Sequence, residues 1–296
     1  MDVTASLTED FEAQRPRLRA VAYRMLGSVS EADDALQEAW LRADRADTSD
    51  VKNPAGWLTT VVARVCLNLL RSRERRHEQP LDDTVHVHVP DPVIGHPDGG
   101  DPEHEALLGD SVGLALMVVL ETLTPAERLA FVLHDMFAVS FTEIAELIER
   151  SPAAARQLAS RARRRVKDQA PAPDPDLGKQ RAVVDAFFAA ARDGDLEALV
   201  AVLDPDVIRR ADGGAALPIP VLHGPRDVAA QAASIAEFAR FGRSVLVNGT
   251  AGALAIADGA VFSVMAFTVV RGKIVSIDVL VDPDRVAGLD LAVLDT

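Results

Sequence analysis

The sequence predicts a multidomain protein in which two all-α helical units are followed by an α+β unit. Apolar residues recur at three- and four-residue intervals over most of the first 168 positions, a pattern typical of amphipathic helices. Segments rich in proline and glycine interrupt that pattern twice. The last third adds β-rich runs separated by turn dipeptides. A length of 296 residues also suits two or three domains.

The two interruptions set the predicted domain boundaries. The first, at residues 78–102, contains five prolines and three glycines from Pro80 to Pro102, a mixture that disfavours both helix and sheet. The second, at residues 169–176, carries three alternating prolines and should act as a semi-rigid spacer. We therefore expect structured units at residues 1–77, 103–168 and 177–296.

The first unit is expected to be a small helical bundle. One helix runs through Phe11, Leu18 and Met25 and ends at Gly27, and Ser30 is expected to cap the second. A third should begin near Pro54 and continue to about residue 76.

Helix-start signals punctuate the second unit. Asp101-Pro102 opens a helix reaching Leu120, and further starts lie at Thr124-Pro125, at Ser140 with Glu143, and at Ser151-Pro152. The last two helices, residues 141–148 and 152–167, are joined by a very short turn. That arrangement predicts a helix-turn-helix.

The third unit begins with helical patterns and ends with β-rich runs. Helical patterns cover residues 181–192, 196–203 and 228–241, and β-rich runs cover residues 244–247, 254–257, 261–270 and 274–281. Asp258-Gly259 and Arg271-Gly272 are turn signals between strands. We expect helices covering a curved antiparallel sheet.

The net charge of −14 conceals a local basic segment. Residues 150–167 contain seven arginines and lysines and no acidic residue, the kind of footprint that attraction to phosphate requires. Ser151 can cap the second helix of the helix-turn-helix. Side chains suited to base edges or phosphate follow it: Arg156, Gln157, Ser160, Arg161, Arg164 and Arg165. The alternative is a merely solvated basic helix.

Residues 140–166 resemble region four of extracytoplasmic-function sigma factors, which reads the minus-thirty-five promoter element, and residues 124–128 resemble the opening of that domain. Residues 23–42 are similar to region two, whose acidic helix binds core RNA polymerase. The resemblance implies a polymerase-binding surface at Asp33, Asp34, Gln37 and Glu38. It also implies minus-ten DNA contacts by Asn68, Arg71, Ser72 and Arg75 on the following helix. The loop at residues 47–53 lacks the aromatic residue that many relatives hold there.

The third unit resembles SnoaL-like domains of the NTF2 superfamily, cone-shaped α+β folds that often enclose a pocket. A group of these sigma factors carries such an extension, and its hallmark patterns are approached by residues 211–214, 281–286 and 89–93. The resemblance implies a regulatory unit that docks within the chain and could hold a small-molecule ligand. The docking residues it implies are Asp212, Gly213, Gly214, Asp282, Pro283, Asp284 and Arg285.

Other clusters favour structural roles. His86, His88 and His96 lie in the linker without a cysteine cluster, so solvated histidines are favoured over a metal site. Asp212 with His223 could form an acid/base pair, but an Asp-Gly-Gly turn is favoured. The lone Cys66 lies among apolar neighbours and should be buried and inert. We expect no catalytic residue, metal or cofactor.

Three functions are compatible with these sequence patterns. The first is a sigma factor; the second is a stand-alone helix-turn-helix regulator, which leaves the acidic helix and the long linker without a role. The third is an NTF2-like small-molecule enzyme with a DNA-binding N-terminus, which leaves the first 168 residues idle. The first residues show no basic stretch followed by an apolar run, so we expect a cytoplasmic protein without a membrane partner.

Overall fold

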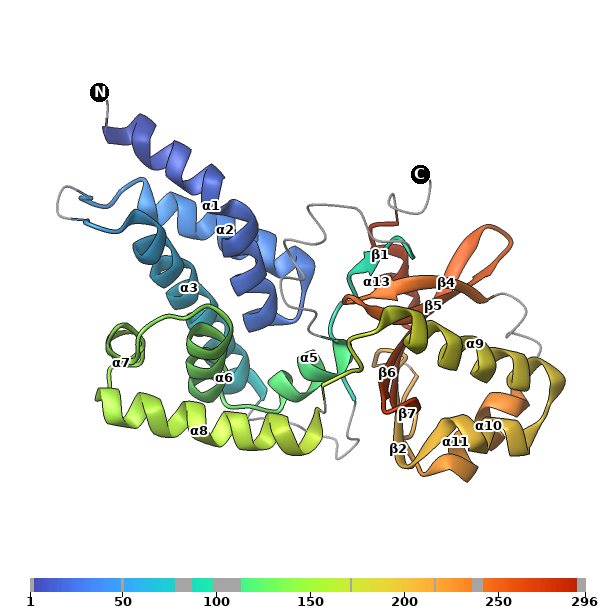
Figure 1. Ribbon diagram of the computed structural model, residues 1–296. Coiled ribbons are helices and arrows are strands. Elements are labelled where there is room, and N and C mark those ends of the chain that lie inside the picture. The colour runs from blue at the N-terminus through green and yellow to red at the C-terminus, as the bar shows by residue number, and fades with distance from the viewer. Residues whose placement is uncertain are drawn as a thin grey trace. The chain divides into compact units, whose positions relative to one another are not determined.

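The structure of the protein is a computed structural model (Figure 1). It describes residues 3–48, 51–77, 87–97, 113–170, 172–215, 217–235 and 242–291. The chain divides into two compact units. One comprises Met1–Asp83 with Val119–Ala170, and the other comprises Thr84–Val118 with Pro171–Thr296.

Three long helices begin the first unit: α1 (Val3–Leu26), α2 (Val29–Ala43) and α3 (Pro54–His77). They pack through fully buried side chains such as Leu18, Met25 and Leu58, and Cys66 is buried among them as expected. Burial raises the pKa of the Cys66 thiol to about 12, which keeps it protonated and inert. The predicted cap of α2 is wrong by two residues: Ser28 occupies the capping position and Ser30 lies inside the helix.

Helix α5 (Leu114–Glu121) spans the boundary between the two units, and the first unit continues with α6 (Pro125–Phe131), α7 (Phe141–Ile148) and α8 (Pro152–Gln169). Capping boxes at Thr124 and Ser140 confirm two predicted helix starts. The predicted start at Asp101-Pro102 lies outside the described residues. A π-helical turn, η1 (Val132–Met136), follows α6 directly and was not predicted.

A seven-stranded sheet forms the second unit, in the order β1-β4-β5-β6-β7-β2-β3. Its strands are β1 (Ile94–Gly95), β2 (Leu203–Asp212), β3 (Leu222–His223), β4 (Gly242–Val247), β5 (Thr250–Ala257), β6 (Ala260–Val270) and β7 (Lys273–Leu280). The sheet is antiparallel except between β2 and β7, which run parallel, so the purely antiparallel prediction is corrected. Both predicted turns are confirmed, with paired positive φ values at Asp258-Gly259 and Arg271-Gly272.

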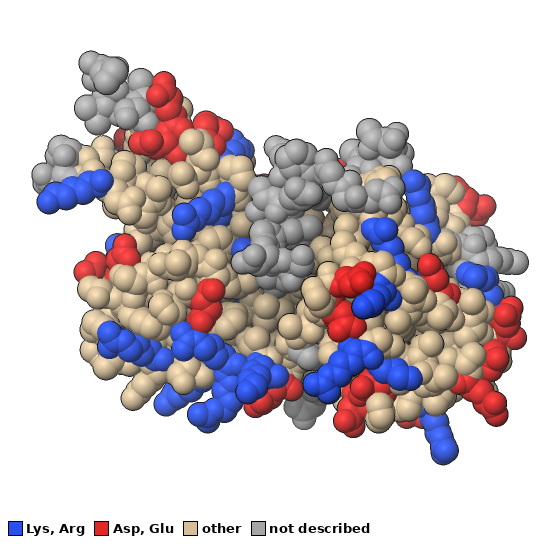
Figure 2. All heavy atoms as spheres, in the orientation of Figure 1, with Lys and Arg blue, Asp and Glu red and all other residues tan. Residues whose placement is uncertain are grey.

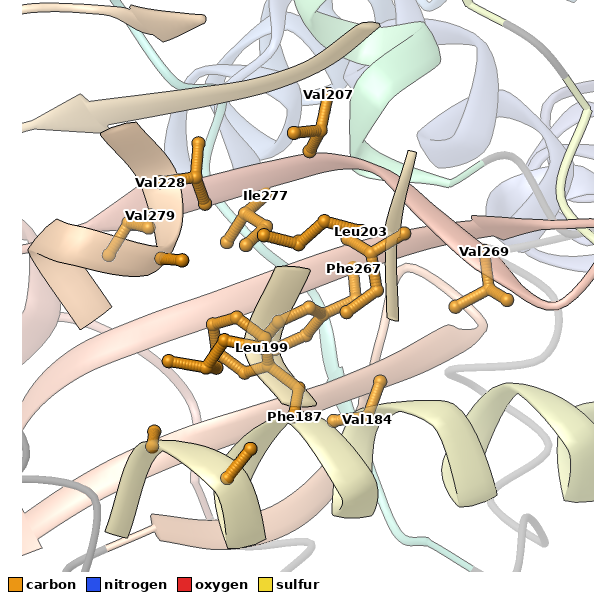
Figure 3. Close-up of a cluster of buried hydrophobic side chains, with 14 of the residues drawn as sticks. Val184, Phe187, Leu199, Leu203, Val207, Val228, Phe267, Val269, Ile277 and Val279 are labelled. Carbon is orange, nitrogen blue, oxygen red and sulfur yellow. The ribbon is translucent and has the colours of Figure 1, made fainter. Parts of the chain in front are cut away.

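Helices α9 (Leu177–Asp193), α10 (Leu196–Val202) and α11 (Pro225–Ser234) contribute apolar faces to the core of this unit, and α13 (Pro283–Ala287) follows β7. Figure 3 shows Phe187 and Val184 from α9 directed at Phe267 of β6. The rings of Phe187 and Phe267 lie 5.5 Å apart in an edge-on arrangement that suits aromatic pairs. The core thus lies between the helices and one face of the sheet.

Residues 87–97, the described part of the predicted linker, belong to the second unit. Within them β1 pairs with β4, and Val93 exchanges two hydrogen bonds with Asn248, of 2.9 and 3.0 Å. Val89, Val93 and Ile94 are buried. The prediction that this segment disfavours sheet is therefore corrected at Ile94–Gly95, where apolar residues between the prolines pack and pair with β4. No helix within the described ranges is long and apolar enough to cross a membrane.

Candidate nucleic-acid interface

The turn between α7 and α8 is built from residues 149–151. Glu149 ends α7 in the left-handed conformation, with φ +56°. Ser151 then starts α8: its side chain accepts a 3.2 Å hydrogen bond from the Ala154 amide, and Pro152 takes the first helical position. This geometry is that of a helix-turn-helix, with the amino end of the second helix left accessible.

One face of α8 is buried and the opposite face is basic. Ala155, Ala159 and Ala162 pack inward, and their small size allows close approach of α6 and α7. The predicted base-reading residues are exposed on the other face, where the three- and four-residue helical spacing aligns them: Arg156, Gln157, Ser160, Arg161 and Arg164. Figure 2 shows basic side chains gathered along the edge where Figure 1 places α8.

Two arginines of α8 are held by the protein itself. Arg165 donates a 2.9 Å hydrogen bond to the carbonyl of Thr122 and lies 3.8 Å from Glu127. Arg163 forms a 2.6 Å ion pair with Asp135. Arg165, predicted to contact DNA, is therefore directed toward α6, whereas Arg156 keeps an exposed head over the ring of Phe141, 5.6 Å from its centroid.

The exposed side of α3 carries a second polar stripe. Asn68 and Arg75 are exposed, and Arg71 and Ser72 are half-buried. Arg64, which sequence patterning missed, continues the stripe one turn earlier and is also exposed. Arg73, in contrast, is ion-paired with Glu31 of α2. The stripe therefore presents amide and guanidinium groups at helical spacing, a surface suited to a nucleic-acid backbone.

The carboxylates of the acidic helix α2 have different surroundings: one binds another helix, and others face solvent. Asp33 accepts two hydrogen bonds from Arg19 of α1, at 2.6 and 2.9 Å, and so ties two helices together. Asp34 and Gln37 are exposed, and Glu38 pairs with Arg42 at 2.5 Å. Leu41 lies on the same face, and 54% of its surface is exposed. It was not among the residues predicted from the sequence. A single exposed leucine is ordinary on a protein surface, so this face is accessible to a partner but is not defined as a binding site by Leu41.

In the second unit the predicted docking residues form one cluster around Asp212 and Arg285. The Arg285 guanidinium donates to Asp212 at 2.7 Å, to Asp91 at 2.6 Å and to the carbonyl of Val89 at 2.6 Å. Asp212 also accepts from the Val89 amide at 2.9 Å and lies 3.2 Å from His88. The cluster thus fastens residues 88–91 to the sheet.

Asp282 shapes the other half of the cluster. Its side chain caps α13 by accepting hydrogen bonds from the amides of Asp284 and Arg285, while its own amide donates to the carbonyl of Asp212. Gly214 has φ +72°, and a Cβ there would lie 2.2 Å from the Asp282 carboxylate. Glycine is needed at this position for both conformation and space. Pro283 and Asp284 serve as the first turn of α13.

The charge state of Asp212 follows from these contacts. Burial alone would raise the pKa of Asp212, but hydrogen bonds from His88, Val89 and Gly214, with the charge of Arg285, hold it well below its ordinary value. Asp212 is therefore a structural carboxylate that is ionised at neutral pH. Its recorded partners do not include His223, whose strand pairs with Ile208 instead, so the two do not form an acid/base pair.

The linker histidines do not form a metal site in the part of the chain that the structure describes. No group of three metal-ligating side chains occurs there. His88 is occupied by the Asp212 cluster, and His86 lies outside the described residues.

Comparisons with known proteins agree with this geometry. Residues 11–76 match the family model for Sigma-70 region 2, and residues 113–166 match the model for Sigma-70 region 4. The chain is 40% identical to the ECF RNA polymerase sigma factor SigJ of Mycobacterium tuberculosis, over 95% of this chain and 94% of SigJ. It is 35% identical to the probable ECF RNA polymerase sigma factor SigI of the same species, over 92% of each chain.

The crystal structure of SigJ, an extracytoplasmic function sigma factor, superposes with a TM-score of 0.76 and 36% identity, covering 96% of this chain and 99% of that one. The two DNA-binding units define the class as a Sigma-70 type transcription factor. The chain belongs, more narrowly, to the ECF sigma factors of RNA polymerase. The predicted fold class, two helical sigma units followed by an α+β unit, is confirmed.

Proposed function

We propose that this protein binds core RNA polymerase, directs it to specific promoters, and uses its C-terminal unit, residues 171–296, to restrain the linker between its two promoter-reading regions. The observation that carries the proposal is the capped, one-sided basic helix α8 within a helix-turn-helix. A sigma factor gives roles to α2, α3 and the linker as well, which a stand-alone regulator does not.

Promoter recognition divides between two helices in this proposal. The exposed residues of α8 from Arg156 to Arg164 read the minus-thirty-five element in the major groove, where arginine and glutamine make bidentate contacts with base edges. The Ser151 end of α8 supplies backbone amides to phosphate. The stripe of Arg64, Asn68, Arg71, Ser72 and Arg75 on α3 holds the minus-ten strand. Arg165 supports the fold of α8 instead of touching DNA.

Polymerase binding is assigned to the exposed face of α2. Asp34, Gln37 and Glu38 offer oxygen acceptors, and Leu41 adds apolar contact. Such a face suits a basic partner surface, because complementary charge speeds encounter and apolar burial then slows dissociation. Asp33 contributes by orienting α2 through Arg19.

Regulation is assigned to the Asp212–Arg285 cluster. It fastens residues 88–91, which lie in the sequence between the two promoter-reading regions. Since that segment sets how far apart those regions reach, holding it changes their spacing. In this proposal the C-terminal unit acts as a regulator and not as an enzyme, and the protein works in the cytoplasm, where polymerase and promoter are found.

The test combines a gel-shift assay with in vitro transcription. Promoter templates are first selected from a random library with holoenzyme assembled from the full chain. We expect a specific shift and a transcript only when core polymerase is present, because the proposal makes recognition a property of the complex. Specific binding by the chain alone, with no transcript on adding polymerase, would instead identify a stand-alone regulator.

A further inference from the structure

The C-terminal unit contains a half-open cavity of about 240 Å³ between its helices and one face of its sheet. Phe187 and Phe188 of α9, Val228 of α11 and Val279 of β7 form its apolar walls. Figure 3 shows Phe187, Val228 and Val279 directed into the same region. An apolar cavity of about 150 Å³ is known to bind benzene, so this one has room for a ligand of roughly ten non-hydrogen atoms.

One charged side chain, Arg209 of β2, lines this cavity. Strand alternation places Arg209 on the same face as Val207 and Ala211, both buried in the apolar core. The parallel register pairs it with Ile277, another wall residue. An arginine therefore occupies an inward position at which an apolar residue would be expected.

The neighbouring residue, Arg210, shows how the same strand pairs an arginine with a carboxylate. Arg210 lies on the opposite face of β2 and pairs with the buried Asp278 at 2.8 Å. Arg209 has no recorded hydrogen bond or ion pair within the described residues, and no described residue lining the cavity is acidic. Burial lowers the pKa of Arg209, which reflects the cost of keeping this half-buried cation without an anion.

A ligand carboxylate supplies what Arg209 lacks. Its two oxygens match the paired donors of a guanidinium, and the pairing strengthens where water is excluded. Gln231 and Ser263 also line the cavity and add polar groups, while the phenylalanines can bury a hydrocarbon chain. We propose that this cavity binds a small monocarboxylic acid, with its carboxylate paired to Arg209 and its apolar tail against Phe187 and Phe188.

The probes are octanoate, which has ten non-hydrogen atoms, and octanamide, its neutral counterpart of the same size. The full-length chain is labelled with carbon-13 at its five methionine methyl groups and followed by NMR during each titration. Met265 lines the cavity, whereas Met25 and Met136 lie in the helical unit. We expect a saturable shift of the Met265 signal alone, assigned by its loss in Met265→Leu. Octanamide should bind at least roughly tenfold more weakly.

Variants then test the role of Arg209. Arg209→Met should bind octanoate and octanamide equally, since it keeps the volume and removes the charge, and Arg209→Lys should retain a preference for octanoate. Arg226→Met, which removes an exposed arginine on α11, should match the wild type. Equal affinities for the two probes in the wild type, an unchanged preference in Arg209→Met, or no Met265 shift would each overturn the proposal. The titrations need no polymerase, so their outcome is independent of the proposed sigma activity.

Discussion

Within the Asp212–Arg285 cluster, Gly214 is the position at which a side chain is least tolerated. A side chain there meets both a left-handed backbone and the Asp282 carboxylate 2.2 Å away. Gly194 has a similar φ of +68° but nothing within 4 Å of an added Cβ. Gly194→Ala should therefore cost only the backbone term, about 1–2 kcal/mol. Gly214→Ala should cost more, because Asp282 must also move.

The free energies of unfolding of both variants, measured with denaturant on the full chain, check this difference. Equal losses in the two variants would show that the close approach to Asp282 carries no energetic weight.

Asp212 makes the stability of the second unit depend on pH. Its folded pKa lies below its unfolded value of about 3.9, so its contribution is fully present above roughly pH 5 and is lost as pH falls toward the folded pKa. Asp212→Asn removes the charge, and we expect wild type to exceed it in stability at neutral pH by about 1–3 kcal/mol.

That stability difference should shrink on acidification, as measured by denaturant unfolding at a series of pH values. A stability difference that stays constant from neutral pH down to acidic pH would contradict the assignment of an ionised Asp212.

At the scale of elements, the proposed function divides α8 into residues that read bases and residues that hold phosphate. Arg161→Ala should cost about 1–3 kcal/mol of discrimination between promoter and non-promoter DNA if its guanidinium is bidentate to guanine. Arg156→Ala should behave alike. Lys167→Ala, at the exposed far end of α8, should weaken binding to all sequences equally. Holoenzyme affinities for both DNAs, measured at one salt concentration, distinguish these outcomes; intact discrimination in both arginine variants would count against α8 as the reading helix.

Helix α2 carries the polymerase prediction. Reversing Asp34 and Glu38 to lysine should weaken association with core polymerase and make the remaining binding less sensitive to salt. The matched control reverses Asp185 and Asp193, two exposed carboxylates of α9, and changes the net charge by the same amount. Pull-down of polymerase at two salt concentrations measures both effects. Equal recovery of polymerase by the two double variants would refute the assignment.

At the scale of the whole molecule, the C-terminal unit is expected to restrain and to support the chain at once. A truncation before Asp282 removes Arg285 and with it the grip on Val89 and Asp91, so transcription should rise. Arg285→Gln should raise it in the same direction without shortening the chain. A truncation after Lys167 removes all of residues 168–296 and should lower transcription. In vitro transcription at matched concentrations compares the wild type, the two truncations and Arg285→Gln. Indistinguishable activities would show that the C-terminal unit does not regulate transcription.

The sequence alone determined the elements whose signals are local. Capping residues and prolines located the starts of α3, α6, α7 and α8, because the bonds that begin a helix lie within four residues of each other. The spacing along α8 likewise placed Arg156, Arg161 and Arg164 on one exposed face, although the predicted set also included Arg165, which the structure holds at Thr122. The turn dipeptides between β5, β6 and β7 were equally local.

Only the tertiary structure decided the features made by residues far apart in the chain. Strand β2 carries too many charged residues to show a strand pattern, and it forms because β7 lies beside it. Val89 in the linker is held by Asp212 and Arg285, more than 120 positions away. Arg165 and Arg209 look alike in sequence, but one is held at a carbonyl and the other lines an apolar cavity. Partners that meet only on folding leave no local pattern, so their roles depend on the packed chain.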